Sequence, residues 1–111
     1  MTPPPARSPR LVAVASVLTT VLAGCGEPGG DPLANQGRQV YLAQCIQCHN
    51  ADPAIAGPVG PPVKGSSREL LDAKVLRGDY PSGYTPKRPT KVMPPQPNLG
   101  SDIPALAAYL K

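Results

Sequence analysis

The chain has almost no large apolar rings with which to build a core. Its 111 residues include no Trp and no Phe, and four Tyr are its only aromatic residues. Seventeen Pro and 11 Gly also interrupt regular structure. A small domain with so thin a core usually depends on disulfides, a metal or a bound group. The three Cys are an odd number, so they cannot all pair with one another within the chain.

The N-terminal segment is first positively charged and then apolar. Arg7 and Arg10 come before an uncharged run, 11–22, which is too short to cross a bilayer as a helix and fits the apolar region of an export signal. The sequence Leu22-Ala23-Gly24-Cys25 follows and resembles the lipobox of bacterial lipoproteins. This resemblance implies a signal peptide over 1–24 and lipidation of Cys25. The alternative is an ordinary signal peptide and a free Cys25.

The segment after Cys25 has the composition of a flexible tether. Residues 26–32 are rich in Gly and Pro and have no apolar periodicity. We therefore expect a lipidated Cys and tether over 25–34 and a folded domain over 35–111, lipid-anchored to a membrane and facing the periplasm or the cell exterior. Loss of the signal leaves nine basic and seven acidic residues. With no basic stripe and no interleaved aromatic residues, the sequence does not predict nucleic-acid binding.

Three segments of the domain have helical patterns, and none alternates convincingly as a strand, so we predict an all-α fold. The first helix is expected over Asn35–Cys45. The second is expected to begin after Ser66 or Ser67 and to end at Arg77, with Gly78 as its C-terminal cap.

The third helix is expected from Ser101-Asp102 to the last residue. Its apolar face recurs at helical spacing and consists of Ile103, Leu106, Ala107 and Leu110. Two Pro-rich loops, 50–65 and 79–100, separate the three helices. The second loop is long enough that a functional role, or wrapping around a bound group, is expected.

The sequence Cys45-Ile46-Gln47-Cys48-His49 is a CxxCH motif, the attachment signature of c-type haem. We expect Cys45 and Cys48 to form thioether bonds and His49, the only His of the chain, to be the proximal iron ligand. Three other readings remain open. A zinc site would lack a ligand, a thioredoxin-like pair would lack its βαβ context, and a Cys45–Cys48 disulfide would leave His49 without a role.

Met93 is the expected sixth ligand of the iron. Met1 is removed with the signal, so Met93 is the one thioether left in the mature chain, and His/Met ligation is common in electron carriers. Pro94 and Pro95 follow it and stiffen the loop. Alternatively, Met93 fills a gap in the core, or a lysine such as Lys91 binds instead.

These motifs together resemble the class I single-haem c-type cytochromes over nearly the whole of 35–111. The resemblance implies a small cytochrome c fold, with three main helices and Pro-rich loops wrapped around one covalently bound haem. It also implies that Gly37 and Tyr41 pack against Leu106 and Tyr109 on the last helix. The alternative for Gly37 is that it lies in a frayed first turn of the first helix.

The resemblance extends to the loop after the haem motif, 60–65. It implies that the carbonyl of Pro61 accepts the N–H of His49 and that Val63 packs against the haem, although the additional Pro62 departs from the family pattern. Tyr80, Tyr84 or Arg88 could contact a haem propionate. The basic cluster of Lys87, Arg88 and Lys91 could steer acidic partners or could simply be solvated.

The sequence therefore predicts a membrane-anchored one-electron carrier of a bacterial respiratory or related chain, and not an enzyme. Its expected cofactor is one haem c, which supplies the large apolar body missing from the core. Its expected partners are redox proteins, and no small-molecule substrate is expected. The alternatives are a haem subunit of a larger oxidoreductase, a ligand-binding haem protein with a displaceable Met93, and a haem-free lipoprotein.

Overall fold

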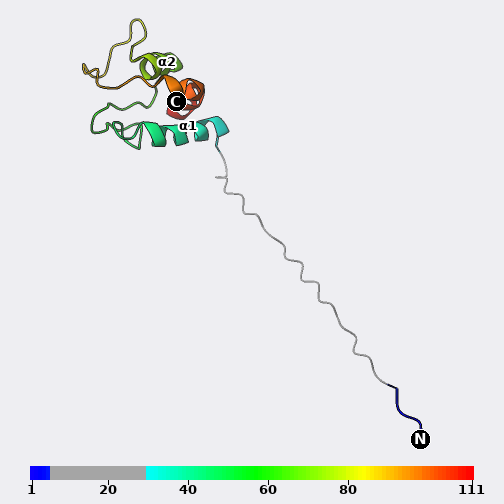
Figure 1. Ribbon diagram of the computed structural model, residues 1–111. Coiled ribbons are helices and arrows are strands. Elements are labelled where there is room, and N and C mark those ends of the chain that lie inside the picture. Colours follow the sequence, from blue (N-terminus) through cyan, green and yellow to red (C-terminus); the bar gives the residue numbers. More distant parts are fainter. Residues whose placement is uncertain (6–29) are drawn as a thin grey trace.

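The computed structural model describes residues 1–5 and 30–111 of the chain. The apolar run of the expected signal, the lipobox and Cys25 lie outside the described residues. The described part contains the α-helices α1 (Pro32–Gln44), α2 (Arg68–Arg77) and α3 (Ile103–Leu110) and the 3₁₀-helix η1 (Pro97–Asp102), and no strand (Figure 1). The predicted all-α class is confirmed for this part of the chain.

Helix α1 begins three residues earlier than predicted. The side chain of Asp31 accepts a hydrogen bond of 3.0 Å from the N–H of Leu33, and Pro32 occupies the first turn, where its missing N–H costs nothing. Residues 32–34, which were expected to belong to the tether, form the first turn of the helix. Asp31 caps the helix and Pro32 is its first residue, so this end of the expected tether is the start of α1.

Helices α1 and α3 lie side by side and cross at Gly37 (Figure 1). A Cβ atom at this position would overlap the backbone carbonyl of Ala105 and come within 2.9 Å of the Cβ of Tyr109. Gly37 is buried, so the alternative of a frayed first turn is wrong. The ring of Tyr41 also meets that of Tyr109, with 5.5 Å between the ring centroids. The backbone contact of Gly37 is with Ala105, one residue before the expected Leu106.

Helix α2 has the two ends that the sequence predicts. The Ser67 hydroxyl accepts from the N–H of Leu70, and Gly78 ends the helix in the left-handed conformation, at φ 73°. The next amide, that of Asp79, donates to the carbonyl of Ala73 at 3.1 Å. Helix α3 begins directly after η1, which occupies the end of the long loop expected over 79–100. Pro104 lies in the first turn of α3, as predicted.

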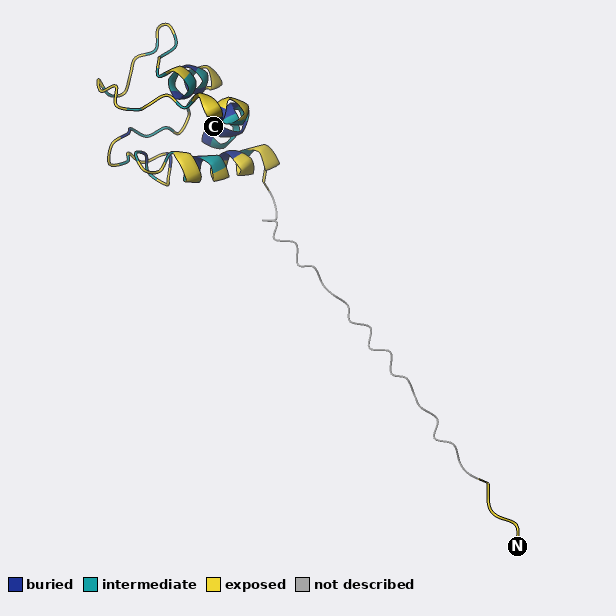
Figure 2. Ribbon diagram, in the orientation of Figure 1, coloured by how far each residue is buried: buried dark blue, intermediate teal, exposed yellow. Residues whose placement is uncertain are grey.

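The buried core lies between the three α-helices (Figure 2). It consists of Tyr41, Leu71, Val75, Leu99, Ile103, Leu106 and Leu110. Three of the four residues predicted for the apolar face of α3 belong to it, whereas Ala107 is half-buried and Ala105 is buried instead. No helix in the part of the chain that the structure describes is both long and apolar enough to cross a bilayer.

Candidate functional site

The CxxCH residues form a turn that continues from the end of α1. The amides of Cys48 and His49 both donate to the carbonyl of Cys45, at 3.3 and 2.9 Å. Cys45 and Cys48 are half-buried free thiols, so the disulfide considered for them is not formed in the structure. Burial raises the pKa of the Cys45 thiol to about 11. This thiol is therefore protonated at neutral pH, and little of the nucleophilic thiolate form is present.

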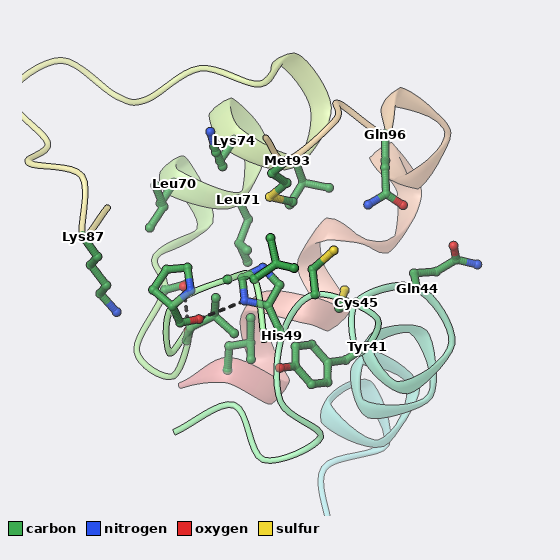
Figure 3. Close-up of a pocket in the computed structure, with 18 of the residues that line it drawn as sticks. Tyr41, Gln44, Cys45, His49, Leu70, Leu71, Lys74, Lys87, Met93 and Gln96 are labelled. Carbon is green, nitrogen blue, oxygen red and sulfur yellow. Dashed lines mark hydrogen bonds between the residues drawn. The ribbon is translucent and has the colours of Figure 1, made fainter. Parts of the chain in front are cut away.

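The imidazole of His49 is buried and held in one orientation. Its Nδ1 lies 2.9 Å from the carbonyl oxygen of Pro61, which is the contact that the resemblance implies (Figure 3). Because a carbonyl oxygen only accepts hydrogen bonds, Nδ1 must carry the proton. In the neutral ring this leaves the lone pair on Nε2, the form needed for binding a metal.

Two glycines let the loop over 57–62 close tightly around the turn. A Cβ on Gly57 would overlap the backbone of Cys48 and His49, and one on Gly60 would collide with the His49 ring. The amides of Val59 and Gly60 also donate to the carbonyl of Cys48, at 3.1 and 2.8 Å. The close approach of Gly57 was not predicted, because Gly57 has no positive φ and belongs to no motif in the sequence.

Tyr41 fixes the chain on the other side of His49. Its side chain is 1% exposed, and its hydroxyl donates a 2.6 Å hydrogen bond to the carbonyl of Asn50, the residue after His49. Burial, with the neighbouring Cys45 thiol as a second cause, raises the pKa of Tyr41 to about 12. Only a packing role was expected for Tyr41, because the sequence does not show which backbone carbonyl a hydroxyl will bind.

Met93 lies in the long loop between α2 and η1. It is half-buried and packs against the core cluster. The loop is tied to α2 after Met93, where the amide of Gln96 donates a 2.6 Å hydrogen bond to the carbonyl of Val75. Figure 3 shows Met93 and His49 coming from separate segments of the chain toward one cavity.

This cavity has a volume of about 460 Å³ and brings the expected site residues together. Cys45, Cys48, His49, Pro61 and Met93 all line it, although they come from three separate segments. Its apolar wall is formed by core helices and includes Leu70, Leu71, Val75, Leu106 and Leu110. The volume is in the range of about 300–1,000 Å³ that small-molecule and cofactor sites occupy.

The charged groups at the cavity are all cations. Lys74, Lys87 and Arg88 line it, and no Asp or Glu among the described residues does so. The ammonium of Lys74 lies 4.3 Å from the ring centroid of Tyr80, which is stacked on Tyr84 with 5.4 Å between the centroids. An apolar cavity with three cations suits an apolar ligand that carries negative charges.

Two residues of the predicted basic cluster have backbone partners. Lys87 Nζ donates to the carbonyl of Pro62 at 2.7 Å, and Arg88 donates to that of Val59 at 3.1 Å. Lys91 is exposed and does not line the cavity. Docking or solvation was expected for this cluster, and the hydrogen bonds between the loops were not.

Among residues 1–5 and 30–111, no group of three or more His, Cys, Asp and Glu side chains is placed to hold a metal ion. In comparisons with known proteins, no protein-family model, no curated protein and no solved structure matches the chain.

Proposed function

We propose that the chain is an exported, lipid-anchored class I c-type cytochrome that holds one haem covalently and carries one electron at a time. The observation that carries this proposal is the meeting of Cys45, Cys48, His49 and Met93 at a single cavity. Met93 lies 44 or more positions after the other three residues in the sequence. The convergence supports the expected set of two attachment points and two axial ligands.

The cavity fits the chemistry of haem in three respects. Its wall is apolar, as a porphyrin face requires. Its cations, Lys74, Lys87 and Arg88, suit the two carboxylates at a haem edge. Its His49 presents Nε2 as the free nitrogen, because Nδ1 is engaged by Pro61. When bound, haem c supplies a one-electron ferric/ferrous couple.

The residues of the chain have separate roles in this proposal. Cys45 and Cys48 attach the group, and Pro61 and Gly60 orient the His49 ring. The thioether of Met93 favours ferrous iron and so raises the potential. With both His49 and Met93 as ligands, the site offers no open position to a substrate. We therefore propose a carrier that exchanges electrons with redox proteins, and not an enzyme.

The proposed location follows from the N-terminal segment. The apolar run over 11–22 and the lipobox ending at Cys25 support export and lipidation at Cys25. Residues from Cys25 to the start of α1 would then connect the lipid to the domain. The domain would face the periplasm or the cell exterior, within reach of partners at the same membrane.

One observation favours a second candidate, a ligand-binding haem protein. Met93 is half-buried and lies in a loop outside the helices, whereas His49 is buried and fixed by Pro61. An iron ligand on a loop is easier to displace than one that is buried and fixed by a hydrogen bond. In this case a small ligand would replace Met93 at the iron.

Redox titration with optical spectra tests the proposal. We expect low-spin iron in both oxidation states, the weak Met–iron charge-transfer band in the ferric form, and loss of that band in Met93→Ala. The variant should have a potential lower by about 200 mV, well within the ~0.8 V range that axial ligands span. An exposed aliphatic residue that does not line the cavity provides a control, because Ile55→Ala should leave band and potential unchanged.

The contrary outcomes separate the alternatives. High-spin ferric iron without the charge-transfer band would favour the ligand-binding protein. A purified protein without haem would overturn the proposal.

A further inference from the structure

Two loops that are far apart in the sequence meet at the rim of the cavity. The loop over 57–62 contacts the ring of His49, and the segment over 86–93 leads to Met93. Two hydrogen bonds, one from Lys87 and one from Arg88, join the two segments and connect residues 25 and 29 positions apart. In Figure 3, Lys87 lies on a segment separate from the helices, and this residue is one of those that line the cavity.

The acceptors of these bonds flank the group that orients His49. Arg88 bonds the carbonyl of Val59 and Lys87 bonds that of Pro62, whereas the carbonyl of Pro61, between them, bonds His49 Nδ1. The amide of Val59 in turn donates to Cys48. A movement of either loop at this point would therefore be transmitted to the other.

We propose that Lys87 and Arg88 are positioning residues that latch the Met93 segment onto the loop that orients His49. The latch, defined as these two side chains and their two carbonyl acceptors, keeps the segment closed over the cavity. It acts through backbone carbonyls, so it needs the donors and not only the positive charge. The role assigned to Met93 rests on the proposed function, whereas the contact between the loops does not.

The latch makes a prediction about loop opening. Lys87→Met and Arg88→Met each remove one hydrogen bond that is exposed at the surface, which corresponds to about a threefold change in the opening equilibrium and about tenfold in the double variant. Hydrogen exchange should therefore be faster by these factors at the amides of Gly60 and Gln96. Exchange in the middle of α1 should not change.

A second readout follows the iron. Exogenous imidazole competes with Met93, so its affinity should rise about threefold in each single variant and about tenfold in the double variant. Lys91→Met is the matched control, because Lys91 carries the same charge in the same segment, is exposed and does not line the cavity. Arg88→Lys, which keeps a donor, should retain an imidazole affinity close to that of the wild type.

Three outcomes would overturn the latch. These are unchanged exchange in the double variant, an equal effect of Lys91→Met, and faster exchange with unchanged imidazole affinity. If the protein carried no haem, the proposed function would fail, and the exchange at Gly60 and Gln96 would still decide whether the latch exists.

Discussion

At the scale of single residues, the site combines groups that the sequence reveals with groups that it hides. Cys45, Cys48 and His49 were expected at one site because they form a contiguous motif, and Met93 because the chain after the expected signal has no other thioether; all four line the same cavity. The partners of Lys87 and Arg88 could not be predicted. Every residue has a backbone carbonyl, so the residue type does not mark an acceptor, and the two loops have no periodicity that would pair them.

Tyr41 gives the first prediction at this scale. Burial raises the pKa of Tyr41 from its ordinary value of 10.0 to about 12 in the folded protein, whereas an unfolded chain releases this proton near pH 10.0. The free energy of unfolding should therefore fall as the pH rises through this interval. Tyr41→Phe should remove this part of the decline. At pH 8 it should cost about 1 kcal/mol, because the carbonyl of Asn50 loses its donor.

Denaturant unfolding at pH 8 and at pH 11.5 measures both effects. Val40→Ala is the control, because Val40 is a half-buried neighbour with no ionisable group, and its cost should be the same at both pH values. If the free energy of unfolding decreased by the same amount between these pH values in the wild type and in Tyr41→Phe, the role of the buried hydroxyl would be contradicted.

At the scale of elements, local signals decided which helix ends could be predicted. Both ends of α2 follow from residues next to them, Ser67 and Gly78. The start of α1 was misplaced because Asp31 and Pro32 occur in a Gly- and Pro-rich stretch that suggests a linker. Helix η1 was missed because Pro97 and Gly100 suggest a loop, although its Leu99 is buried in the core.

The crossing of α1 and α3 gives the second prediction. In an exposed helix, replacing Gly by Ala stabilises by about 1 kcal/mol. Gly37→Ala should instead destabilise the protein by about 1–3 kcal/mol, because the new methyl group overlaps the Ala105 carbonyl and forces the helices apart. Thermal and denaturant unfolding measure the change.

The neighbouring Gln36 supplies the matched control for this crossing. It is exposed on the same helix, and Gln36→Ala should change stability by less than about 0.5 kcal/mol. If Gly37→Ala were as stable as the wild type or more so, the close contact between α1 and α3 would not exist in the protein.

At the scale of the whole molecule, the cavity explains how a chain with so few rings has a core. Tyr41, Leu71, Val75, Leu106 and Leu110 belong both to the core cluster and to the cavity wall. An apolar group bound there would bury the wall side of all five residues at once. Under the proposed function, the thin core and the Pro-rich loops would be consequences of one arrangement, in which the chain folds around a bound haem.

The covalent attachment of haem is the central claim, and one mass measurement tests it most directly. Trypsin cuts after Arg38 and Lys64 and releases peptide 39–64, which contains Cys45, Cys48 and His49. The protein should be isolated from cells that attach haem c to exported proteins, and this peptide analysed by mass spectrometry. We predict that it carries the mass of one haem bound through both cysteines. The same peptide at its unmodified mass, or lighter by the two hydrogens of a disulfide, would contradict the account.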